Sequence, residues 1–94
     1  MRLLVAYDIE TRDDAGERRL REVARLMEGF GIRVQRSVFE CELNSAQQAK
    51  LEMSIAAVID PRCDSVLVYR LAPQKTLRLG KSGPDPFTPI AFVR

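Results

Sequence analysis

The carboxylate of Asp8 is the group best placed to do chemistry, because it ends the first apolar run of the chain, LLVAYD. A carboxyl group at the end of a strand lies where the chain leaves the sheet for a loop. Two interpretations follow from this position. In the first, Asp8 begins a turn or accepts hydrogen bonds from loop amides. In the second, its carboxylate oxygens bind a divalent cation.

A single carboxylate makes a weak cation site. Mg²⁺ prefers six oxygen ligands and keeps several waters, and metal-assisted cleavage of phosphodiesters usually gathers more than one acid. A two-fold dimer would bring a second copy of Asp8 across its axis. The cation hypothesis therefore predicts that Asp8 is half of a site that two chains complete.

The residue types that are missing narrow the chemistry further. The chain contains no histidine, which excludes Ser-His-Asp and Cys-His nucleophile pairs. Cys41 and Cys63 are isolated, with no CxxC pair, so we expect reduced thiols and no zinc site. The sequence also lacks a glycine-rich phosphate loop. Hydrolysis would therefore use carboxylates, hydroxyls, arginines or a metal held by oxygen ligands.

Several arginines are candidates for contact with the phosphates of a nucleic acid. They are Arg18, Arg19, Arg33, Arg36 and Arg78, the last of which lies in a basic final third of the chain. The net charge of +2 is too small to identify a nucleic-acid-binding protein by itself. Acids alternate with arginines along the first predicted helix, and this mixture also fits a solvated, salt-bridged face.

Three further residues have both a structural and a functional interpretation. Tyr7 and Phe39 fit the apolar core, or a platform on which bases stack. Ser37 is either a hydroxyl ligand or a simple turn former.

Apolar periodicity predicts two helices. The first follows an N-cap at Asp13 or Asp14, with Glu17 completing a capping box, and Gly29 and Gly31 are expected to end it in the left-handed conformation. Its buried stripe is Leu20, Val23, Ala24, Met27 and Phe30.

The second helix is expected to begin at Asn44 or Ser45, with Gln48 in a capping box, and to end before Pro61. Its buried stripe is Leu51, Ile55, Val58 and Ile59.

The remaining apolar segments predict strands. Residues 3–8 and 65–72 each form one, and residues 32–43 form two strands with a tight connection or one long strand with a bulge. The order β-α-β-β-α-β is that of an α+β, ferredoxin-like fold. We expect this domain to span residues 1–75. The tail, residues 76–94, would add an extra C-terminal edge strand at 76–79 and a proline-rich linker at 82–89.

The strands are apolar on both faces. In the first of them, Leu3 and Val5 alternate with Leu4 and Ala6. Helices cover only one face of a ferredoxin-like sheet, so a second copy of the chain is the expected cover for the other. The sequence predicts a homodimer packed sheet to sheet, with the tail packing on or pairing with the partner. No apolar run is long enough to span a bilayer and no signal sequence appears, so a cytoplasmic location is expected.

Four segments together resemble the Cas2 family, the small non-integrase subunit of CRISPR spacer acquisition. They are LLVAYDI, RRLREVARLMEGFG, RVQRSVFECEL and IDPRCDSVLVYRL, in this order within residues 1–71. The resemblance implies a ferredoxin-like homodimer whose paired strand-end aspartates face each other.

The resemblance also assigns roles to individual residues. It makes Asp8 the metal ligand, for Mg²⁺ or another divalent cation such as Mn²⁺. The positions implicated in nuclease activity are Tyr7, Arg33, Ser37 and Phe39. Arg18 and Arg19 fall in the basic segment of the family.

Two activities follow from the resemblance, and the sequence does not choose between them. Some members are metal-dependent endonucleases that act on single-stranded RNA or duplex DNA. Others are non-catalytic bridges that bind DNA between subunits of the CRISPR integrase. Outside the family, a ferredoxin-like small-molecule sensor is the remaining alternative.

Overall fold

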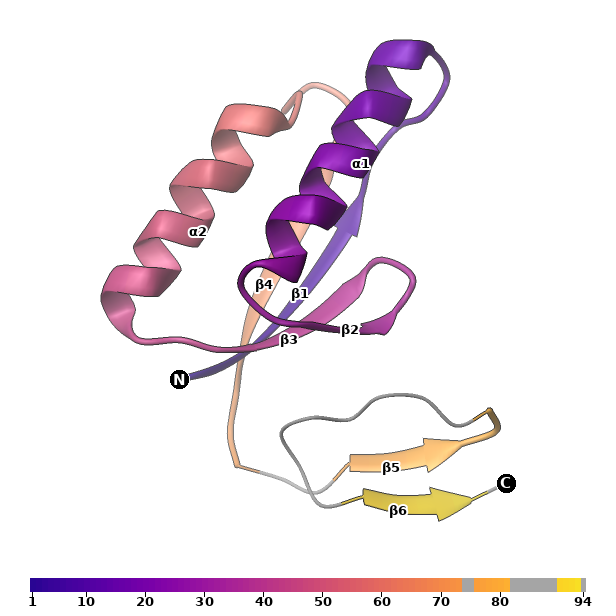
Figure 1. Ribbon diagram of the computed structural model, residues 1–94, viewed down its shortest axis with the longest axis vertical. Helices are drawn as coiled ribbons and strands as arrows, with labels where there is room; N and C mark the ends of the chain where they lie inside the picture. The colour runs from indigo at the N-terminus through magenta and orange to yellow at the C-terminus, as the bar shows by residue number, and fades with distance from the viewer. Residues whose placement is uncertain (74–75, 82–89, 94) are drawn as a thin grey trace.

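The computed structural model describes residues 1–73, 76–81 and 90–93, the last as backbone only. Within these ranges, two helices and six strands follow one another (Figure 1). They are β1 (Arg2–Asp8), α1 (Asp14–Glu28), β2 (Ile32–Gln35), β3 (Val38–Glu42), α2 (Ser45–Val58), β4 (Ser65–Leu71), β5 (Thr76–Leu79) and β6 (Ile90–Val93).

The first six elements after the N-terminus build one sheet covered by two helices. The four strands run in the order β2-β3-β1-β4, and every neighbouring pair is antiparallel. Figure 1 shows α1 and α2 on the same side of this sheet. The predicted ferredoxin-like α+β arrangement is confirmed. No helix among the described residues is long and apolar enough to cross a membrane.

The core lies between the helices and one face of β1. Leu3, Val5 and Tyr7 are buried on that face, and they pack in one cluster with Val23 of α1 and Leu51 of α2. Burial of each large aliphatic side chain contributes about 1.5–3 kcal/mol. The alternation of side chains along a strand sends the intervening residues of β1 to the opposite face.

Helix α1 begins at one of the two predicted N-caps but ends differently from the sequence expectation. Asp13 is the N-cap, and its Oδ1 accepts a hydrogen bond from the Gly16 N–H at 2.8 Å. Glu17 therefore lies one residue beyond the capping-box position. Gly29 has a right-handed φ of −78°, so the predicted left-handed cap is wrong. Position 31 requires glycine for a steric reason, because a Cβ there would overlap the Glu40 carbonyl oxygen.

Helix α2 is capped by Asn44, which exchanges hydrogen bonds with Gln47 rather than Gln48. Of its predicted stripe, Leu51 and Ile55 are buried, whereas Val58 is only partly buried. The segment before this helix forms two strands, and the β2–β3 pairing also shifts register between Arg33 and Gln35. Both features proposed for residues 32–43, the tight connection and the bulge, are therefore present.

The tail contains the predicted strand Thr76–Leu79, but this strand does not extend the four-stranded sheet. It pairs in parallel with β6 and forms a separate two-stranded sheet (Figure 1). Leu77 and Leu79 are exposed in it. A two-stranded sheet is rarely stable without further packing, so pairing of the tail with a partner stays a prediction. The proposed linker at residues 82–89 lies outside the described residues.

Candidate active site

Asp8 lies at one end of the sheet, where three segments meet. It is exposed, and its register partner on β4 is Ser65. On the other side of β1, the Tyr7 N–H donates a 3.0 Å hydrogen bond to the Ser37 carbonyl, which brings the β2–β3 turn to the same end. The structure therefore groups Asp8, Ser37 and Ser65. Ser65 was not among the residues predicted from the sequence, although antiparallel pairing of the first and last strands would have indicated it.

The face of the sheet that the helices leave uncovered is apolar beside Asp8. We call this surface the open-face patch; its apolar members are Leu4, Ala6, Val38, Leu67 and Tyr69, and the buried side chain of Glu40, the register partner of Leu4, lies on the same face. The side chains of Leu67 and Tyr69 are 52% and 51% exposed. Because Ala6 pairs with Leu67 and Asp8 with Ser65, the carboxylate lies at the border of the patch.

Tyr7 and Phe39 lie in the core, on the helix side of the sheet. Both are buried, and their rings stack with centroids 6.2 Å apart. The Arg33 guanidinium lies over the Phe39 ring at 5.2 Å, a cation–π contact. Of the two interpretations given to these side chains, apolar core or stacking platform, this placement favours the core. Strand alternation directs Tyr7 away from the face on which Asp8 is exposed.

The predicted phosphate contacts lie in different surroundings. Arg36 is exposed in the β2–β3 turn, next to Ser37, so the fold brings it to the Asp8 end of the sheet. Arg18 is exposed on α1. Arg33 belongs to the aromatic stack described above, and Arg78 lies in β5 of the two-stranded sheet.

Arg19 differs from its exposed neighbour because it forms a buried ion pair with Asp64. Its Nε lies 2.8 Å from Asp64 Oδ2, and the Asp64 side chain is 0% exposed. The same carboxylate accepts hydrogen bonds from the N–H groups of Glu10 at 3.0 Å and Asp60 at 2.8 Å. The sequence offers two interpretations of Arg19, a phosphate contact or part of a salt-bridged helix face, and neither identifies Asp64 as its partner.

The ion pairs of this region shift the pKa values of two carboxyl groups. The hydrogen bond from Arg19 lowers the pKa of Asp64 to about 2, and that from Arg62 lowers the pKa of Asp60 to about 2. Burial raises the pKa of the nearby Cys63 thiol, which disfavours its reactive thiolate form.

These lowered pKa values predict a loss of stability in acid. An unfolded aspartate has a pKa of about 3.9, so the folded state is favoured above that pH, and this stabilisation is lost as pH falls through about 2. We expect the urea midpoint to fall between about pH 4 and pH 2, and to fall less steeply in Asp64→Asn. If the urea midpoint fell equally steeply with pH in both proteins, the lowered pKa of Asp64 would not be the cause of the acid sensitivity.

One chain supplies too few ligands for a complete metal centre. Among the described residues, no group of three or more His, Cys, Asp or Glu side chains could hold an ion. Mg²⁺ is nevertheless often held by one or two carboxylates together with waters. Asp8 is exposed at the border of an apolar face, so two chains would supply two Asp8 carboxylates. Two carboxylates with waters fit the ligands that Mg²⁺ uses.

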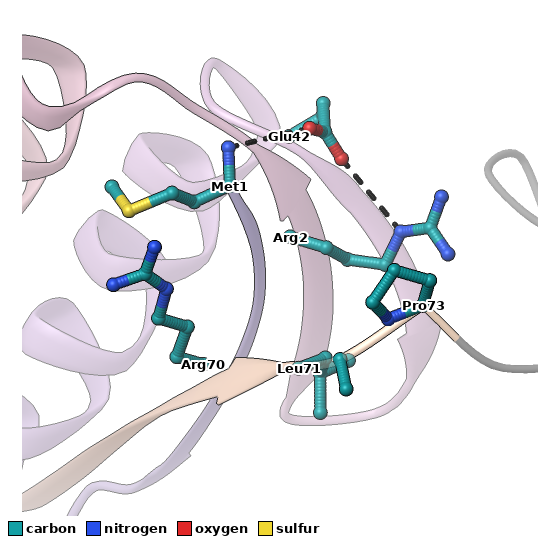
Figure 2. A pocket seen from close by; sticks show the side chains of 7 residues that line it. Met1, Arg2, Glu42, Arg70, Leu71 and Pro73 are labelled. Atoms are coloured by element: carbon teal, nitrogen blue, oxygen red, sulfur yellow. Dashed lines mark hydrogen bonds and ion pairs between the residues drawn. The ribbon is translucent and has the colours of Figure 1, made fainter.

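The pocket seen in Figure 2 is not this site. It is a hollow of about 430 Å³ at the opposite end of β1 from Asp8, where Met1 and Arg2 both pair with Glu42. Its lining residues are Met1, Arg2, Glu42, Arg70, Leu71, Ala72 and Pro73.

Comparison with known proteins gives consistent matches. The model of the family "CRISPR associated protein Cas2" matches residues 1–78. A Moorella thermoacetica protein named CRISPR-associated endoribonuclease Cas2 1 is 46% identical over 71 residues, which are 76% of this chain and 74% of the relative. A Halalkalibacterium halodurans protein named CRISPR-associated endonuclease Cas2 is 37% identical over 86 residues, 92% of this chain and 90% of the relative.

Solved structures agree with the sequence matches. The crystal structure of Streptococcus pyogenes Cas2 superposes with a TM-score of 0.72 at 42% identity, covering 77% of this chain and 87% of that one. A hypothetical protein from Thermus thermophilus superposes with a TM-score of 0.69 at 36% identity, covering 78% and 83% of the two chains.

Proposed function

The chain belongs to the Cas2 family of CRISPR-associated proteins, and we propose that it is an endonuclease that hydrolyses phosphodiesters of RNA or duplex DNA with the help of a divalent cation. The observation that carries the proposal is the exposed Asp8 at the border of the open-face patch, grouped with Ser37 and Ser65. Curated relatives named as an endoribonuclease and as an endonuclease support both substrate classes.

The site requires a homodimer. The open-face patch is an apolar surface on a sheet whose other face is already covered by helices, and Leu67 and Tyr69 remain half exposed in the single chain. In a two-fold dimer the same patch serves both partners. Packing patch against patch would bring the two copies of Asp8 toward the same border, where their carboxylates would hold Mg²⁺ or Mn²⁺.

Each residue at the Asp8 end then has a defined task. A bound cation would polarise the scissile phosphate and lower the pKa of a water molecule. Asp8 would hold that cation in place. The hydroxyls of Ser37 and Ser65 would orient the phosphate by hydrogen bonds, and the exposed Arg36 would bind its negative charge.

The runner-up function is a non-catalytic scaffold that binds duplex DNA and docks on the CRISPR integrase in the cytoplasm. One observation favours it: Arg18 and Arg36 are exposed and available to bind the phosphates of duplex DNA. The two functions make opposite predictions for cleavage. An endonuclease cleaves RNA or duplex DNA with Mg²⁺ and stops in EDTA or when Asp8 is replaced, whereas a scaffold binds DNA and cleaves under none of these conditions.

A further inference from the structure

A buried ion pair links helix α1 to the loop that leads into β4, at the Asp8 end of the sheet. Arg19, from α1, meets Asp64, which directly precedes β4. We propose that Arg19 and Asp64 are a positioning pair that fixes Asp8 for cation binding. Arg19 then acts through the geometry of the site and not as a phosphate contact. This inference rests on the proposed role of Asp8.

The hydrogen bonds of Asp64 use both oxygens of its carboxylate. Oδ1 accepts from the Glu10 N–H at 3.0 Å, and Oδ2 accepts from the Asp60 N–H at 2.8 Å and from Arg19 Nε at 2.8 Å. Arg19 Nη2 also lies 3.4 Å from Oδ1. A fully buried carboxylate with this many donors is held in one orientation.

These contacts hold the backbone just beyond the end of β1 and just before the start of β4, next to Asp8. Glu10 is two residues beyond Asp8, and between them Ile9 is anchored in the core. Asp64 directly precedes Ser65, the register partner of Asp8. The carboxylate of Asp64 therefore joins the exit of β1 to the entry of β4 immediately beside the exposed acid.

The carbonyl of Glu10 is contacted from helix α1 as well. Arg19 Nη2 lies 3.5 Å from this oxygen, and Gly16 packs so closely that an added Cβ would overlap it. Gly16 and Arg19, both in helix α1, thus contact the same carbonyl group of Glu10. Such supporting contacts are what keep a metal ligand within a narrow range of positions.

The environment of Arg19 argues against a phosphate contact. Its side chain is only 20% exposed, whereas Arg62, in the α2–β4 loop, is 87% exposed in its pair with Asp60. Breaking the buried pair to bind phosphate would leave the Asp64 charge buried and uncompensated. A buried ion pair is also weak evidence for stability, because its desolvation cost offsets much of the attraction. Its position beside Asp8 favours a geometric role.

The test compares Arg19→Gln, Arg19→Lys and the matched control Arg62→Gln, which removes an ion pair from the same loop region without touching Glu10. The first readout is hydrogen exchange of the Glu10 amide, measured by NMR without metal. The second is the Mn²⁺ dissociation constant, measured by electron paramagnetic resonance well below the melting temperature. The third is the Mn²⁺ dependence of cleavage.

In Arg19→Gln, we expect Glu10 exchange to accelerate and Mn²⁺ affinity to fall, each by about tenfold, as for other supporting partners of metal ligands. The Mn²⁺ concentration for half-maximal cleavage should rise by the same factor, with the rate at saturating Mn²⁺ unchanged. Arg19→Lys should recover part of the loss, because an ammonium group still pairs with Asp64. Arg62→Gln should match the unsubstituted protein in all three readouts.

Two results would overturn the proposal. An unchanged Mn²⁺ affinity with a lower melting temperature would make the pair merely structural. An unchanged Mn²⁺ affinity with weaker, less salt-dependent nucleic-acid binding would make Arg19 a phosphate contact. If Arg19→Gln does not fold, Asp64→Asn, which keeps the side-chain volume, serves in its place with the same expectations. Failure of the proposed function is distinguishable, since Asp8→Asn would then leave Mn²⁺ binding unchanged.

Discussion

Replacing Asp8 with Asn is expected to abolish metal-stimulated cleavage while the protein keeps its fold. The substitution removes the negative charge that would bind the cation. Because each chain carries the substitution, both carboxylates of the proposed site are lost at once. Metal-ion catalysis is worth several kcal/mol, and each ~1.4 kcal/mol is a factor of ten in rate, so the cleavage rate should fall by at least about 100-fold. Cleavage of RNA and duplex DNA with Mg²⁺ or Mn²⁺, against an EDTA blank, measures the effect.

Stability should hardly change in this variant. Asp8 is exposed at the end of β1, and surface substitutions of this kind alter the free energy of unfolding by about 0.5 kcal/mol or less. Asp14→Asn is the matched control, since it removes an exposed carboxylate from the first turn of α1 and should cleave normally. Undiminished cleavage by purified Asp8→Asn would remove Asp8 from the catalytic site.

Introducing a charge into the open-face patch is expected to dissociate the dimer and to abolish cleavage with it. Leu67→Glu places a carboxylate opposite Ala6, in the middle of the apolar surface. In an isologous interface the charge appears twice, and each unpaired charge that must be buried costs several kcal/mol. The dimer dissociation constant should therefore rise by at least about 100-fold.

Helix α2 offers a matched control for this substitution. Met53 is 74% exposed on α2, which covers the opposite face of the sheet, so Met53→Glu should leave both the dimer and cleavage intact. Sedimentation velocity gives the oligomeric state, and circular dichroism checks that both variants remain folded. A Leu67→Glu protein that still dimerises, or a monomer that still cleaves with metal, would contradict the proposed interface.

The sequence was informative where a feature depends on local periodicity. The apolar stripe of α1 and the phase change at Arg36 and Ser37 predicted the element order correctly, because side-chain burial repeats with the geometry of each element. The exposed end position of Asp8 followed from the same pattern. The absence of histidine, a matter of composition alone, excluded imidazole chemistry.

Features that depend on contacts distant in sequence could not be predicted in this way. Arg19 and Asp64 are 45 residues apart, and periodicity does not distinguish a buried ion pair from two solvated charges. Alternation along β1 separates two faces but does not say which of them the helices cover, so the burial of Tyr7 and Phe39 remained open. The N-caps Asp13 and Asn44 were among the predicted candidates, but the predicted capping-box partners Glu17 and Gln48 lie one position too far along, because Asp13 and Asp14, or Asn44 and Ser45, are equally good caps.

The stoichiometry of Mn²⁺ binding tests most directly whether two chains share one cation through their Asp8 carboxylates. Titration followed by electron paramagnetic resonance counts bound ions per chain. We predict one tightly bound Mn²⁺ for every two chains in the unsubstituted protein, and none in Asp8→Asn. One ion bound by every chain, or a stoichiometry that survives the loss of Asp8, would contradict the shared site.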